Sequence, residues 1–141
     1  MYSTNIKDDR YAVDCLIISH KISLEKFVVD TGAKFTCCGY KAIDGRLEEK
    51  ALSNCEIKSI GGFVKGEYLK FYRLTLRQFT IGNIDMGEQD IWITFDERIT
   101  DIILGMDILK QIIMITNPYD QKIYFCRDRE DYDDNFELAA G

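Results

Sequence analysis

The sequence has one histidine, His20, one proline and no long apolar segment in 141 residues. A lone histidine gives poor support to a zinc site, and it lies in no arrangement typical of histidine-dependent serine or cysteine hydrolases. The apolar runs are far shorter than the roughly 18 residues that a membrane-spanning helix requires, and no basic and apolar leader is visible. We therefore expect no bound metal and no membrane partner.

Positive charge is also scarce. The chain has 18 Lys and Arg against 24 Asp and Glu, for a net charge of -6. Without a basic stripe we expect no nucleic-acid partner. Glycines 61, 62 and 66 lack the spacing of a phosphate loop, so no nucleotide or other cofactor is expected. Because acidic residues crowd the end of the chain, we expect one domain over residues 1–126 and a flexible acidic tail over 127–141, solvated or serving as a regulatory extension.

Cysteine is present, but the number of cysteines is not even. The chain has five cysteines, an odd count in a sequence long enough to bury a core without disulfides. Reduced thiols of this kind are typical of cytoplasmic proteins, which is the location we expect. The adjacent residues Cys37 and Cys38 fit buried packing positions or, alternatively, a redox-sensitive pair.

Strand-forming residues dominate what is present: 19 isoleucines, 8 tyrosines and 8 phenylalanines stand against 6 alanines. Strands are predicted over residues 12–19, 24–29, 54–60, 67–79, 91–95, 101–105, 112–116 and 122–126, and short helices over 44–52 and 106–111. A turn at residues 20–23 is expected to join the first two strands. In the segment 67–79 neither face is cleanly polar, so we expect a hairpin covered on both sides.

Three glycine motifs follow one another along the chain. Asp30-Thr31-Gly32-Ala33 ends an apolar strand, Ile60-Gly61-Gly62-Phe63 occupies a hairpin, and Leu104-Gly105 ends a second apolar strand before a helix. In this order the motifs resemble the retropepsin-like aspartic proteases, from about Val13 to Phe125. The resemblance implies an all-β closed barrel with a flap hairpin and one or two short helices, and an aspartic endopeptidase without a cofactor.

The resemblance implies a role for each matching residue. Asp30 would supply a catalytic carboxylate that activates the lytic water. The residues that would support its loop are Thr31, which bonds across a twofold axis, Gly32, Ala33, Leu104 and Gly105. The flap residues Ile60, Gly61, Gly62 and Phe63 would admit a peptide or protein substrate, bound mainly through its backbone.

The sequence holds a single Asp-Thr-Gly, so the second carboxylate of such a site must come from another copy of the chain. We therefore expect a homodimer with a twofold axis at the site. Lys34 stands where retroviral members usually carry an acidic residue, and the chain continues past Cys126, where retroviral dimers interleave their ends. Substrate preference and dimer strands therefore do not carry over.

Other interpretations of the same residues stay open. Residues 28–32 alone also fit a strand that closes in an ordinary turn, and Gly61-Gly62 fits a plain hairpin turn. The chain as a whole also fits a catalytically silent dimerisation or peptide-binding module with the same fold, or a structural barrel whose motif arose by chance.

Overall fold

The structure is a computed structural model that describes residues 1–7, 10–17, 26–43, 48–100, 102–117 and 119–136. The strands are β1 (Tyr2–Lys7), β2 (Arg10–Ile17), β3 (Lys26–Val29), β4 (Cys37–Gly39), β5 (Ile57–Gly61), β6 (Tyr68–Leu76), β7 (Phe79–Ile81), β8 (Ile84–Asp85), β9 (Gln89–Thr94), β10 (Ile102–Leu104), β11 (Ile113–Asn117) and β12 (Lys122–Cys126). The helices are η1 (Tyr40–Ala42), η2 (Glu49–Leu52), α1 (Met106–Leu109) and α2 (Arg129–Phe136).

The predicted all-β class with a few short helices is confirmed. The predicted turn at residues 20–23 lies outside the described residues. Of the predicted helix over 44–52, residues 44–47 lie outside them too, and the described end forms η2. The helix predicted over 106–111 is present as α1.

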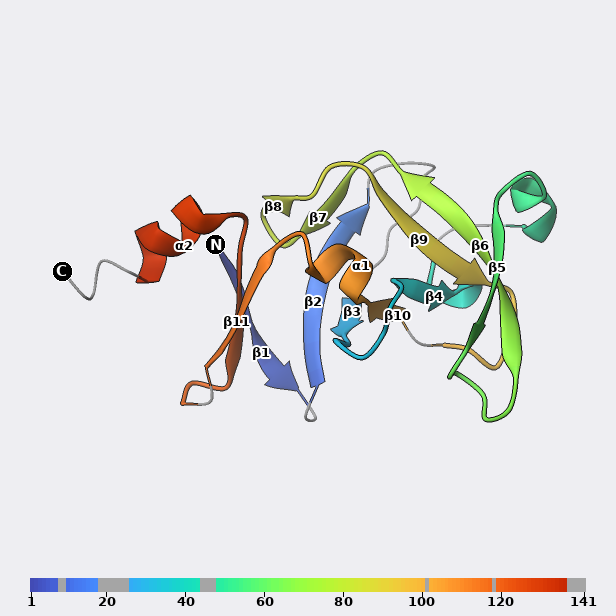
Figure 1. The fold of residues 1–141 in the computed structure, drawn as a ribbon, viewed down its shortest axis with the longest axis horizontal. Coiled ribbons are helices and arrows are strands. Elements are labelled where there is room, and N and C mark those ends of the chain that lie inside the picture. The colour runs from blue at the N-terminus through green and yellow to red at the C-terminus, as the bar shows by residue number, and fades with distance from the viewer. Residues whose placement is uncertain (8–9, 18–25, 44–47, 101, 118, 137–141) are drawn as a thin grey trace.

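The described strands join in the order β11-β12-β1-β2-β3-β10-β4-β9-β6-β5, with β7 pairing with β2 and β8. This order has two ends, β11 and β5, so the pairings among the described residues do not by themselves trace a closed barrel. The molecule is elongated, with α2, β1 and β11 at one end and the β5–β6 hairpin at the other (Figure 1). Between them lie β3, β10 and α1.

The central strand β10 joins segments that are far apart in the sequence. It pairs in parallel with β3, where Val29 lies opposite Leu104. On its other side it pairs antiparallel with β4, where Ile103 lies opposite Cys37. Because β3 and β10 are parallel, they end at the same edge of the sheet, and the residues that follow them meet there.

Strand β6 changes its buried face partway along. Leu69 and Phe71 are buried in a small cluster with Trp92, whereas Tyr72 and Leu74 are buried in the main core. The hairpin is therefore covered on both sides, as expected, but by a different cluster on each half of β6. Each half of β6 buries one face, and the switch after Phe71 produced the mixed pattern in the sequence.

The acidic end of the chain contains helix α2. Asp131 in its first turn accepts a hydrogen bond from the Arg127 N–H at 2.9 Å, and acidic residues at this end of a helix are stabilised by its dipole. The Phe136 ring contacts the Tyr124 ring of β12 at 5.5 Å between centroids. Residues 129–136 of the expected tail thus form a helix that contacts the sheet through this ring pair.

Candidate active site

The loop after β3 closes around the Asp30 carboxylate. The Asp30 N–H donates to the Leu104 carbonyl oxygen at 3.0 Å, and the Ala33 N–H donates to the Asp30 carbonyl oxygen at 3.1 Å. The Gly32 N–H donates to Asp30 Oδ1 at 2.9 Å. A Cβ at Gly32 would lie only 3.2 Å from Oδ1, so a side chain there would crowd the carboxylate. Asp30 is half-buried, and among the described residues Oδ2 has no hydrogen-bond donor.

A buried bridge between Thr36 and Asp107 holds the other end of the loop. Thr36 Oγ1 donates to Asp107 Oδ1 at 2.6 Å, and the Thr36 N–H donates to Oδ2 at 3.1 Å. The Gly105 N–H donates to Thr36 Oγ1 at 3.0 Å. The Met106 N–H donates to the Ala33 carbonyl oxygen at 2.8 Å. These bonds fix the loop on the first turn of α1.

Leu104 and Gly105 pack against the loop, where the sequence analysis placed them. Leu104 is fully buried, and a Cβ at Gly105 would lie 2.5 Å from the carbonyl group of Phe35. No side chain fits at Gly105 while the loop keeps this path. The Thr36–Asp107 bridge was not predicted. An aspartate in the first turn of a helix is common on protein surfaces, so Asp107 alone gave no signal. The one signal in the sequence was that an aspartate lies close to each of the two glycine motifs of the loop, Asp30 beside Gly32 and Asp107 beside Gly105.

The β5–β6 hairpin faces this loop. Gly62 has φ of 99°, a conformation that L side chains rarely adopt, and a Cβ at Gly61 would lie 2.9 Å from the Tyr68 ring. Phe63 packs its ring against Phe71 at 5.2 Å between centroids. The conformation of Gly62 and the contact between the Phe63 and Phe71 rings therefore bend the hairpin tip toward the small cluster that contains Phe71.

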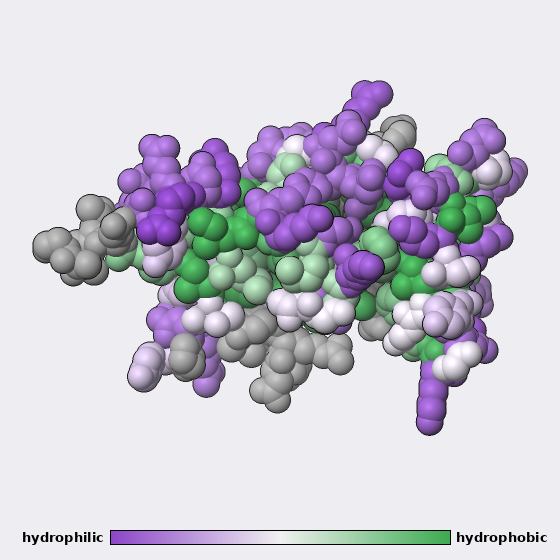
Figure 2. Space-filling view, in the orientation of Figure 1, coloured by the Kyte–Doolittle hydropathy of each residue, from purple (hydrophilic) through white to green (hydrophobic). Residues whose placement is uncertain are grey.

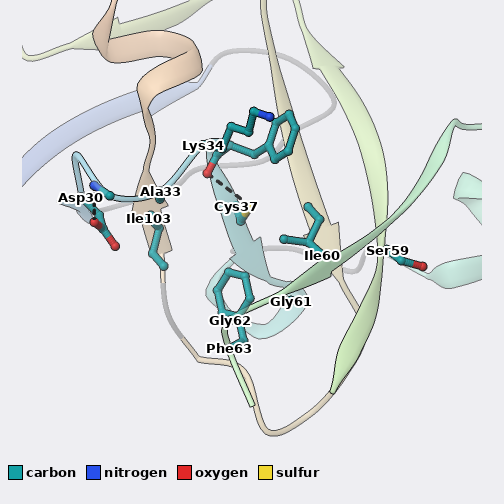
Figure 3. Close-up of a pocket in the computed structure, with 12 residues that line it drawn as sticks. Asp30, Ala33, Lys34, Cys37, Ser59, Ile60, Gly61, Gly62, Phe63 and Ile103 are labelled. Carbon is teal, nitrogen blue, oxygen red and sulfur yellow. Dashed lines mark hydrogen bonds between the residues drawn. The ribbon is translucent and has the colours of Figure 1, made fainter. Parts of the chain in front are cut away.

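A cleft of about 480 Å³ separates the loop from the hairpin (Figure 3). Its walls are Asp30, residues 32–35, Cys37, residues 59–63 and Ile103. The predicted residues Asp30, Gly32, Ala33, Ile60, Gly61, Gly62 and Phe63 thus line one cavity. Thr31 is exposed and does not line it, and Leu104 and Gly105 are buried behind the loop. An apolar cavity with a few polar groups is the usual form of a ligand site.

Cys37 is the cysteine that lines the cleft. Its thiol donates to the Phe35 carbonyl oxygen at 3.3 Å. Burial, with a smaller contribution from the nearby Asp107 charge, raises the pKa of Cys37 to about 12. Burial also raises the pKa of Cys38. Both thiols are therefore protonated near neutral pH, which favours packing over redox chemistry, because the thiolate is the reactive form.

The described residues contain no group of three or more His, Cys, Asp or Glu side chains arranged to hold a metal ion. Within the same residues, every helix is too short or too polar to cross a membrane.

No protein-family profile and no curated protein sequence matches this chain. Among solved structures, the chain is similar to the crystal structure of a retropepsin-like aspartic protease from Rickettsia conorii, with a TM-score of 0.61 and 20% sequence identity. The match covers 88% of this chain and 89% of that chain. At this identity the likeness establishes the architecture, and the chain has the retropepsin-like fold.

Proposed function

We propose that this protein is an aspartic endopeptidase whose active site is completed by a second copy of the chain. The observation that carries the proposal is the position of Asp30 in a retropepsin-like fold. Its carboxylate lies in the cleft opposite a glycine-containing hairpin, with one oxygen left without a donor among the described residues. A peptide in extended conformation fits between such a loop and hairpin by adding its backbone to a strand edge.

Peptide hydrolysis by this site requires two carboxylates. Among the described residues, Asp30 is the only acidic side chain that lines the cleft, and the sequence contains no second Asp-Thr-Gly. Two Asp30 side chains brought together on a twofold axis would resist simultaneous ionisation and share one proton, so that one acts as base and the other as acid. The sharing of one proton is established behaviour of the two catalytic aspartates of aspartic proteases, and we adopt it for the two Asp30 side chains. The pair would titrate as a unit.

Strand β11 offers a surface on which a second copy can bind. It ends the strand order, and among the described strands only β12 pairs with it. Ile113, Met114 and Ile115 of β11 are half-buried, and apolar side chains gather over β11 between α1 and α2 (Figure 2). An apolar edge strand is a template for another chain. Two copies joined through β11 would need no interleaved chain ends.

Replacing the carboxylate tests the activity. In cleavage of a random peptide library, followed by mass spectrometry from acidic to neutral pH, we expect Asp30→Asn to lower the rate by at least about 10²–10⁴. Asp134→Asn, an exposed site in α2, is the matched control and should cleave like the wild type. Equal cleavage by wild type and Asp30→Asn would contradict the proposal. Peptide binding without cleavage in both would identify the silent binding module instead.

A further inference from the structure

The described wall of the cleft has one charged side chain of each sign. Apolar side chains form much of its wall, including Phe35, Ile60 and Phe63. Its charged side chains are Asp30, which the proposed reaction uses, and Lys34. Among the described residues, no carboxylate other than Asp30 lines the cleft.

Lys34 is available to a ligand. It is exposed and follows Asp30 on the same loop, with Ala33 between them in Figure 3. Among the described residues it has no ion pair or hydrogen bond through its side chain. By contrast, two arginines are paired: Arg73 pairs with Glu56 at 2.7 Å and Arg98 pairs with Glu67 at 2.7 Å.

A second ammonium group lies against the same wall. Lys58 Nζ is 4.3 Å from the centroid of the Phe35 ring and 4.8 Å from that of the Trp92 ring. Phe35 follows Lys34 and lines the cleft. Aromatic faces attract cations but do not neutralise them, so this half-buried lysine adds positive potential beside Lys34.

We propose that the cleft selects peptides that carry an acidic residue near an apolar one, with the acidic side chain paired to Lys34. The inference rests on the proposed function for its cleavage readout. An apolar wall with one unpaired ammonium group complements an apolar side chain next to a carboxylate, whereas a basic peptide residue meets like charge. In a twofold dimer each copy contributes one Lys34, so acidic residues are favoured on both sides of the scissile bond.

The test uses two libraries of short peptides that are identical except that one carries Glu as its sole charged residue and the other carries Lys. We expect wild-type protein to cleave the Glu library about five- to tenfold faster than the Lys library. This is the combined effect of an exposed ion pair between Glu and Lys34 and of the repulsion between Lys34 and a peptide lysine. Lys34→Glu should reverse the preference. Lys110→Glu makes the same charge change at an exposed site outside the cleft and should keep the wild-type ratio. The preference should shrink as salt is added.

A binding measurement separates this inference from the proposed function. The two libraries are passed over immobilised Asp30→Asn protein with and without Lys34→Glu, which requires no cleavage. Stronger retention of the Glu library that disappears with Lys34→Glu supports the inference even if the wild type cleaves nothing. Equal retention, or equal cleavage of both libraries by an active wild type, overturns the acidic preference and leaves the endopeptidase proposal standing.

Discussion

Asp30 owes its orientation to backbone groups rather than to neighbouring charged side chains. Its N–H is bound by the Leu104 carbonyl, and its Oδ1 accepts from the Gly32 N–H. The sequence motif could predict the turn from Asp30 to Gly32, because these residues are close in the sequence, but not the bond to Leu104. The Thr36–Asp107 bridge could not be predicted in the same way, because its partners are 71 positions apart and meet only after β3 and β10 have paired.

The Thr36 hydroxyl should contribute measurably to stability. Thr36→Val keeps the shape but removes one of the two donors to Asp107 Oδ1, the Ile108 N–H being the other, and leaves the Gly105 N–H without its acceptor, so we expect a loss of about 1–3 kcal/mol in unfolding free energy. Thr36→Ser keeps the hydroxyl and should lose less. Urea denaturation measures both, and a Val variant as stable as the Ser variant would show that the bridge contributes little.

The Cys37 thiol makes stability depend on pH in the alkaline range. Burial raises the pKa of Cys37 from 9.0 to about 12, so the folded state keeps a proton that the unfolded state releases between these values. Stability is therefore unaffected below about pH 9 and falls above it, by up to about 1.4 kcal/mol per pH unit from this thiol. Cys37→Ala should make the decline in urea denaturation shallower. An identical slope in the variant would refute the assignment.

The hairpin of β5 and β6 combines two glycines with different requirements. A Cβ at Gly61 meets the Tyr68 ring, whereas a Cβ at Gly62 meets nothing within 4 Å and is opposed only by the positive φ. The sequence predicted a hairpin here from Gly61-Gly62. It could not show which glycine is required by space and which by conformation, because that depends on the side chain across the hairpin.

Substitution separates these two requirements. Gly62→Ala should destabilise the hairpin by about 1–3 kcal/mol through backbone strain alone. Gly61→Ala should be relieved in part by Tyr68→Ala, because the smaller side chain removes the clash, while Gly62→Ala should gain nothing from that change. Hydrogen exchange of β5 and β6 amides follows the hairpin in each variant. Equal rescue of both glycine variants would disprove the distinction.

Element patterns in the sequence worked best for strand β9 and the pair β11–β12, which lie close to their predicted ranges. In strand β6 the buried face changes at Tyr72, between two clusters that no local pattern reveals. Helix α2 was missed because its composition is acidic and its packing depends on a ring contact with β12.

For the whole molecule, activity should depend on association. If each copy supplies one Asp30, specific activity falls on dilution in step with dissociation measured by analytical ultracentrifugation. Ile115→Glu places a charge on the edge strand β11 and should weaken both together, whereas Ile57→Glu, at a site that is 49% exposed on the opposite edge strand β5, should leave the oligomeric state unchanged. Full specific activity from a species that sediments as a monomer would exclude a shared site.

The position of β10 also sets when the site can form during synthesis. Asp30 emerges from the ribosome early, but the carbonyl that orients it belongs to Leu104, and β10 lies between β3 and β4. A nascent chain that ends before β10 lacks the central strand of its own site. Pairing across such a sequence separation is slow and must await the synthesis of β10. The order of the strands therefore keeps the carboxylate loop incomplete until the chain has been made through Leu104.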